Sequence, residues 1–78
     1  MSPKFLEESG FTFRIFSNEE IRMHIHVYRE LKEAKFWLEP SVEMAYNKGF
    51  NKVDLSKIIK IIRKNEEDFK EKYRRHIR

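Results

Sequence analysis

Two histidines, His24 and His26, occupy alternate positions in the segment 21–28, where apolar and polar residues alternate. Residues two apart on a β-strand point to the same face, which would place the two Cβ atoms about 6 to 7 Å apart. This spacing suits two ligands of one metal ion, because neutral imidazole is a common metal ligand. A zinc site needs a third protein ligand, for which Glu20 and His76 are the candidates.

Acid–base chemistry is a second interpretation of this histidine pair. One imidazole would accept a proton and the other would donate one, while Arg22 would stabilise a phosphate. The structural interpretation is two histidines on a partly exposed sheet face, and the residues alone favour it over both chemical roles. The candidate catalytic residues are Glu20, Arg22, His24 and His26, and we predict neither a bound metal nor a cofactor.

The C-terminal third of the chain provides a second candidate site. The formal net charge of the 78 residues is +4, and residues 51–78 hold ten basic residues against five acids. A solvent-facing arc of the predicted helix carries four basic residues and no acid: Lys57, Lys60, Arg63 and Lys64. Such an arc could neutralise several phosphates or bind an acidic partner, although an ordinary solvated helix face has the same composition.

The spacing of apolar residues predicts the elements that position these sites. Period-two alternation predicts short strands at residues 11–16, 21–28 and 34–38, with a fourth strand or a helical turn at 42–46. Over residues 52–77 the apolar period changes to about 3.6, as in an amphipathic helix, and the interruption at Asn65 predicts a bend or break. We therefore expect one α+β domain over residues 1–78, with a three- to four-stranded antiparallel sheet packed against a long or bent C-terminal helix.

The two periodicities also predict which side chains meet. The apolar residues of the second strand, Ile21, Met23, Ile25 and Val27, should pack against Leu55, Ile59 and Ile62 of the helix. His24 and His26 should then lie on the opposite face of the sheet, together with Trp37.

Composition excludes several classes of protein. There is no cysteine, so a disulfide scaffold and a cysteine-ligated zinc site are excluded. No window approaches the ~20 apolar residues of a membrane span. The sequence contains neither a Gly-rich phosphate loop nor a Gly-flanked nucleophilic serine. We expect a soluble, cytoplasmic protein.

Several segments resemble the bacterial family called domain of unknown function 4160. They are Asn18-Glu19, His24-Ile25-His26-Val27, Lys35-Phe36-Trp37-Leu38-Glu39, Asn47-Lys48-Gly49-Phe50 and Asp54-Leu55. The resemblance covers nearly the whole chain, and the His-x-His-Val element is its most specific part. Many members have a further His where this chain has Glu20, and a Pro where it has Arg22.

This resemblance implies a biological setting. Members are often encoded beside another small protein in toxin–antitoxin-like arrangements. The resemblance therefore implies a small protein partner, with RNA or DNA as a further target. Two alternatives remain open: a small His-based or metal-dependent hydrolase, and a structural interaction module.

We expect the His24–His26 face to be the functional surface, but we expect the isolated protein not to bind zinc tightly. Two imidazoles would leave a tetrahedral ion half ligated by water, and ligand orientation normally needs hydrogen-bonded support. Calorimetric titration with zinc tests this expectation. Sub-micromolar, stoichiometric binding that disappears in both His24→Ala and His26→Ala would contradict it.

Overall fold

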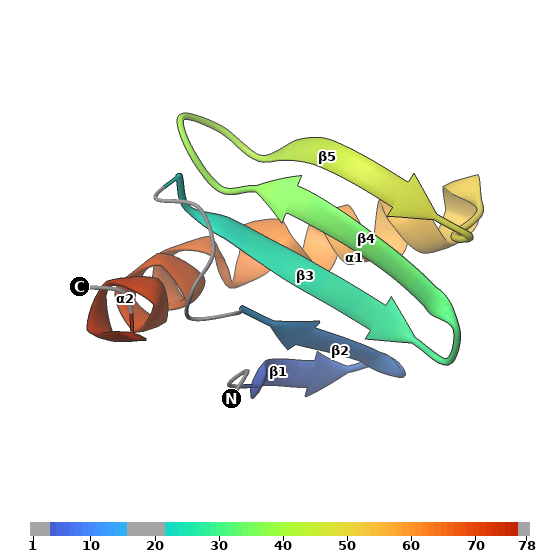
Figure 1. The fold of residues 1–78 in the computed structure, drawn as a ribbon, viewed down its shortest axis with the longest axis horizontal. Coiled ribbons are helices and arrows are strands. Elements are labelled where there is room, and N and C mark those ends of the chain that lie inside the picture. The colour runs from blue at the N-terminus through green and yellow to red at the C-terminus, as the bar shows by residue number, and fades with distance from the viewer. Residues whose placement is uncertain (1–3, 16–21, 77–78) are drawn as a thin grey trace.

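The computed structural model describes residues 4–15 and 22–76 of the chain. Within these residues the chain forms five strands and two helices (Figure 1). In chain order they are β1 (Lys4–Glu8), β2 (Phe11–Arg14), β3 (His24–Arg29), β4 (Lys32–Trp37), β5 (Glu43–Lys48), α1 (Lys52–Lys64) and α2 (Glu66–His76). The strands form one antiparallel sheet in the order β1-β2-β3-β4-β5, which confirms the predicted α+β class.

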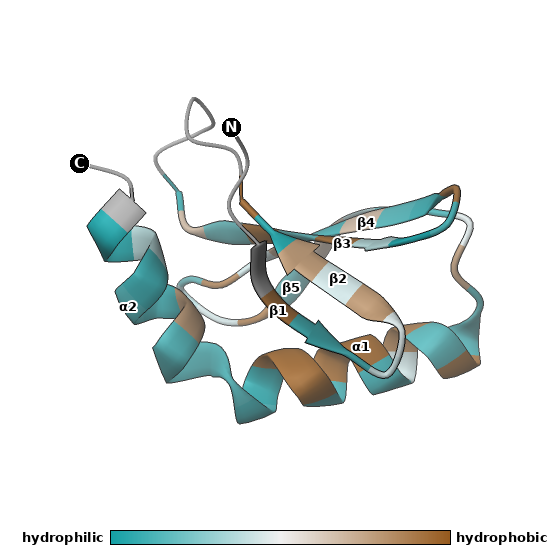
Figure 2. Ribbon diagram, turned by 90° about the horizontal axis from the view of Figure 1, so that it is seen from below, coloured by the Kyte–Doolittle hydropathy of each residue, from teal (hydrophilic) through white to brown (hydrophobic). Residues whose placement is uncertain are grey.

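The first helix covers one face of this sheet. Figure 2 shows α1 running below the strands and α2 turning upward from the end of α1. Ile25 and Val27 of β3 are fully buried in the same core cluster as Ile58 and Ile62 of α1. This confirms in part the predicted contact between the period-two face and the helical stripe, because Ile62 is a predicted partner and Ile58 is not. Among the other residues named for that contact, Met23, Leu55 and Ile59 are partly buried, and Ile21 lies outside the described residues.

The sheet has one more strand than the three or four predicted. The missed strand is β1, Lys-Phe-Leu-Glu-Glu, whose apolar residues are adjacent and show no alternation. It pairs with β2 through a two-residue turn in which Ser9 and Gly10 have φ values of 55° and 81°. Positive φ at both positions is typical of a type I′ turn, which matches the twist of paired strands. Pairing with β2 therefore stabilises a strand in a segment whose sequence pattern alone does not predict one.

Other boundaries also differ from the prediction. The segment 42–46, left open between strand and helical turn, is the edge strand β5. The regular strand β2 ends at Arg14 rather than at residue 16, and β4 begins at Lys32 rather than at residue 34. The β3–β4 connection is shorter than the gap between the predicted strands 21–28 and 34–38, because Arg29 already pairs with Lys32.

The predicted break at Asn65 is confirmed, since α1 ends at Lys64 and α2 begins at Glu66. The Asn65 side chain donates from Nδ2 to the carbonyl oxygen of Ile61 at 2.8 Å. A short amide side chain that bonds the backbone in this way competes with the regular helical ladder. Of the helices in the described part of the chain, neither is long and apolar enough to span a membrane.

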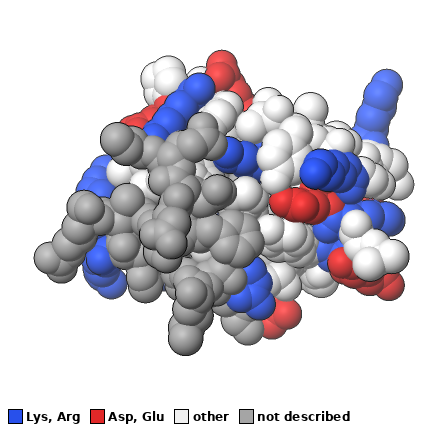
Figure 3. Space-filling view, viewed as in Figure 1, with Lys and Arg blue, Asp and Glu red and all other residues white. Residues whose placement is uncertain are grey.

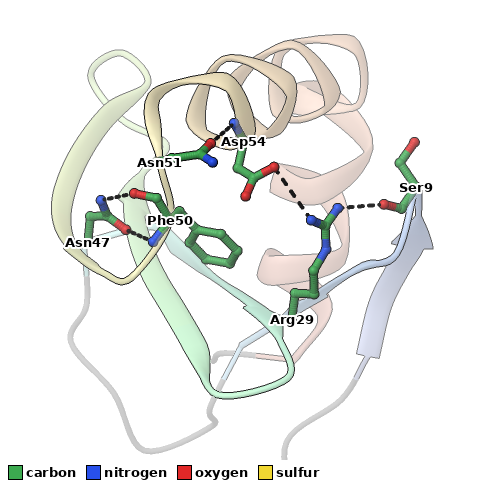
Figure 4. Close-up of polar contacts among 6 residues, drawn as sticks. All are labelled: Ser9, Arg29, Asn47, Phe50, Asn51 and Asp54. Carbon is green, nitrogen blue, oxygen red and sulfur yellow. Dashed lines mark hydrogen bonds and ion pairs between the residues drawn. The ribbon is translucent and has the colours of Figure 1, made fainter.

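Three polar contacts fix where α1 begins (Figure 4). Asn51 caps the helix, because its Oδ1 accepts from the backbone N–H of Asp54 at 2.8 Å. Asn47, near the end of β5, bonds both backbone groups of Phe50 at 2.9 and 3.0 Å. The turn between β5 and α1 is therefore held by hydrogen bonds between the side chains of Asn47 and Asn51 and the backbone.

We predict that Phe69→Ala lowers the free energy of unfolding by about 3 to 5 kcal/mol, as expected for a fully buried phenylalanine. Phe69 of α2 packs on Phe13 of β2 with ring centroids 5.6 Å apart, so its loss opens a cavity between helix and sheet. Urea unfolding followed by circular dichroism measures the change. Glu71→Ala, an exposed position in the same helix, is the control, and a loss below about 1 kcal/mol in Phe69→Ala would contradict this packing role.

Candidate functional site

A groove of about 360 Å³ lies between α1 and the β1–β2 hairpin. Lys57, Lys60 and Lys64 line it from the helix, with the largely buried Ile61 beside them. The end of β1 and the following turn contribute Glu8 and Ser9 from the other side. We call this feature the lysine groove.

Helical spacing explains which of the predicted basic residues reach the lysine groove. Lys57, Lys60 and Lys64 follow one another by three and four residues, so they fall within about 60° around the helix axis. Arg63 lies about 120° from Lys57 by the same geometry. It is exposed but does not line the groove. The structure thus brings together three of the four residues of the predicted basic arc.

The charges within the lysine groove are unequal. Glu8 is the one acid among the described residues that line it, and it faces three lysines. Its Oε2 lies 2.7 Å from Nζ of Lys64. Lys57 and Lys60 are exposed and form no ion pair with another described residue. Ammonium groups grouped in this way can bind phosphate or carboxylate oxygens.

Arg29 holds the two walls of the lysine groove together. From the end of β3, its Nη2 donates to the carbonyl oxygen of Ser9 at 3.0 Å, and its Nη1 lies 3.4 Å from Oδ1 of Asp54 (Figure 4). Its guanidinium carbon also sits 3.9 Å from the ring centroid of Phe11. Ser9 belongs to the hairpin wall and Asp54 to the first turn of α1, so this one side chain links the hairpin to the helix.

The histidine pair lies elsewhere, on the sheet face directed away from α1. His24 and His26 alternate with the buried residues Ile25 and Val27, and their ring centroids are 5.2 Å apart. His24 pairs across the strands with Trp37, at 6.0 Å between ring centroids. The predicted sharing of this face by the histidines and Trp37 is confirmed.

The expected partial exposure of the pair is wrong. The relative exposure of His24 is 0% and that of His26 is 4%. Tyr73 of α2 packs on His24, at 5.7 Å between ring centroids, because the break at Asn65 directs α2 toward this end of the sheet. Nδ1 of His24 lies 2.8 Å from the carbonyl oxygen of Arg22. Because a carbonyl oxygen can only accept a hydrogen bond, we assign a proton to Nδ1.

The side chains around the pair form a mixed aromatic and ionic surface. Glu33 Oε2 accepts from the hydroxyl groups of Tyr46 at 2.5 Å and Tyr28 at 3.4 Å, and it lies 3.7 Å from Nδ1 of His26. Figure 3 looks onto this face and shows acidic and basic side chains side by side in its coloured part. Both signs of charge occur here, whereas the lysine groove holds three lysines and one acid.

Arg22 does not extend from this face as an isolated cation. Its guanidinium lies 4.3 Å from the ring centroid of Trp37 and donates to the carbonyl oxygen of Glu39 at 2.9 Å. Nη2 of Arg22 also lies 3.3 Å from Glu43. These contacts tie the start of β3 to the β4–β5 connection. The predicted catalytic role of Arg22 with His24 and His26 stays a prediction.

The proposed third metal ligands cannot be placed. Glu20 lies outside the described residues, as does the side chain of His76. Among the side chains that the structure does describe, no three His, Asp or Glu come together as a metal-binding group.

The comparisons with known proteins give one family. The family described as Domain of unknown function (DUF4160) matches residues 10–74. Neither the curated proteins nor the solved structures with which the chain was compared contain a match. The match covers most of the lysine groove and the histidine pair, but it begins after Glu8 and Ser9.

We predict that His24→Ala lowers the free energy of unfolding by about 2 to 4 kcal/mol, as for other large-to-small changes at buried sites. Its ring fills the space between Trp37 and Tyr73, so tryptophan emission should shift as solvent reaches Trp37. Urea unfolding followed by fluorescence measures both effects. His24→Phe keeps the ring contacts and should recover most of the loss, whereas unchanged stability in His24→Ala would show that the ring does not support the sheet.

Proposed function

Because the chain belongs to the DUF4160 family, we propose that it is one component of a toxin–antitoxin-like pair and contacts nucleic acid through its lysine groove. The family resemblance supports the pairing with a second small protein. The contact with nucleic acid is supported by the groove itself.

The observation that carries the proposal is the convergence of Lys57, Lys60 and Lys64 on one groove. The three positions span about 10 Å along the helix at 1.5 Å per residue, so they can contact successive phosphates of one strand. Each phosphate that a lysine neutralises releases condensed counterions, and this release provides sequence-independent affinity. The groove residues include no arrangement that reads base edges, so we propose binding that tolerates many sequences.

Binding has more support than catalysis. The residues that line the lysine groove supply amines, a hydroxyl and one carboxylate, but no imidazole. The imidazoles of His24 and His26 are buried against aromatic side chains on the other face of the sheet. A substrate bound in the groove would therefore not meet the residues considered for acid–base chemistry.

The partner protein enters the proposal from the resemblance alone, so it has a separate test. The chain would be tagged and expressed with the small protein encoded beside it, and the complex would be isolated in high salt to remove nucleic acid. A stable one-to-one complex supports the pair, and failure to co-purify at any salt concentration argues against it.

For the lysine groove, we predict weak, strongly salt-dependent binding of a fluorescently labelled 20-nucleotide single strand or duplex, measured by anisotropy. Three phosphate contacts give a slope of log affinity against log salt of about −2 to −3. In Lys57→Gln/Lys60→Gln the slope should fall to about −1 or less in magnitude, because at most the Lys64 contact remains.

The matched control is Lys70→Gln/Lys72→Gln, which removes the same charge from α2. These two lysines pair with Glu66 and Asp68 at 2.9 and 3.1 Å and do not line the groove. Equal slopes in the two double variants, or affinity that does not change with salt, would contradict the proposal.

A further inference from the structure

We infer that Glu8 is a resident occupant of the lysine groove. Its carboxylate holds the place on Lys64 that a ligand phosphate would take, and a phosphate chain displaces it at a lower concentration than a single anion does. This inference rests on the proposed function and adds a residue that controls access to the groove.

The contact between Glu8 and Lys64 has the form of an occupied anion subsite. Oε2 of Glu8 and Nζ of Lys64 are 2.7 Å apart, the distance of a charge-assisted hydrogen bond. Carboxylate and phosphate oxygens are both acceptors for an ammonium group, so either can complete this contact. Lys64 therefore already carries an acceptor, whereas Lys57 and Lys60 make no ion pair with any described residue.

The fold supports this contact from both sides. Glu8 is the last residue of β1, and the next residue, Ser9, is tied through its carbonyl oxygen to Arg29. Arg29 in turn contacts Asp54 in the first turn of α1, the helix that ends at Lys64. The hairpin that carries Glu8 and the helix that carries the lysines are thus held against each other by a contact independent of the Glu8–Lys64 pair.

The same contact is open to exchange. The side chains of Lys64 and Glu8 are 63% and 31% exposed, so a ligand can reach both. Exposed ion pairs of this kind are weak, and displacing one costs a ligand about 1.5- to 5-fold in affinity. Glu8 can therefore yield to a ligand without unfolding of the hairpin.

The preference of Lys64 for a phosphate chain over a free anion follows from the attachment of Glu8 to the same polypeptide. A carboxylate attached to the same chain acts at an effective concentration of the order of millimolar, which a dilute free anion does not match. A phosphate chain bound to Lys57 and Lys60 presents its next phosphate to Lys64 as a tethered group as well. The strand therefore reaches Lys64 at a lower concentration than free phosphate does.

The neighbouring Glu7 provides a matched control. It lies in the same strand and carries the same charge, but its carboxylate accepts from Thr12 Oγ1 at 3.4 Å and does not line the groove. Glu8→Gln and Glu7→Gln each remove one negative charge, so both variants attract a polyanion more strongly through their higher net charge. A difference in affinity between them therefore reports the position of Glu8.

The test compares Glu8→Gln, Glu7→Gln and Glu8→Gln/Lys64→Gln with the unmodified chain. Anisotropy gives the affinity for the labelled 20-nucleotide strand, and NMR of the lysine side chains follows titration with that strand or with inorganic phosphate. We expect Glu8→Gln to bind the strand about 1.5- to 5-fold more tightly than Glu7→Gln. In Glu8→Gln the Lys64 signals should respond to about 1.5- to 5-fold less phosphate than in the unmodified chain, whereas the strand should shift them in both. The gain in affinity should vanish in the Lys64 double variant.

Equal affinities in Glu8→Gln and Glu7→Gln, or a gain that persists without Lys64, would overturn the inference and leave the lysine groove proposal standing. Absence of strand binding in every variant would instead overturn the proposed function. In that case the phosphate titration decides for Glu8: a Lys64 response at lower phosphate concentration in Glu8→Gln than in Glu7→Gln supports its role as occupant, and equal responses in these two variants refute it.

Discussion

The Arg29 side chain makes the contact on which the arrangement of hairpin and helix depends. It joins the backbone of the β1–β2 turn to the first turn of α1 and covers the ring of Phe11 between them. A guanidinium suits this position because its planar fork can donate in two directions while its face lies on an aromatic ring. Arg29 thus links the hairpin and the helix that form the two walls of the lysine groove.

The break at Asn65 gives the two faces of the sheet different environments. The first helix remains parallel to the sheet and exposes its lysines beside the hairpin, whereas α2 turns so that Tyr73 covers His24. The residue pattern most suggestive of catalysis consequently becomes part of a packed aromatic cluster. The basic helix, whose composition also fits an ordinary solvated face, forms one wall of the groove.

Sequence periodicity was sufficient to predict the helix break and the faces of β3, because both depend on local alternation of apolar residues. It could not predict β1, whose adjacent Phe5 and Leu6 do not alternate, and so it missed Glu8 and Ser9 as groove residues. The three groove lysines could have been separated from Arg63 by their three- and four-residue spacing alone. The burial of His24 could not, because it requires Tyr73, a contact made across 49 residues of chain.

The sheet order follows the sequence order, so every strand pairs with its neighbour along the chain. Pairing of this kind closes only short loops, which costs little chain entropy and favours early formation of the sheet. The lysine groove has the opposite character, because its ion pair joins residues 8 and 64, which are 56 positions apart. A ribosome-bound chain that has emerged only as far as β5 would already contain every strand of the sheet but none of the groove lysines. Any activity of the groove therefore begins only when synthesis has passed α1 and the helix has returned to the first hairpin.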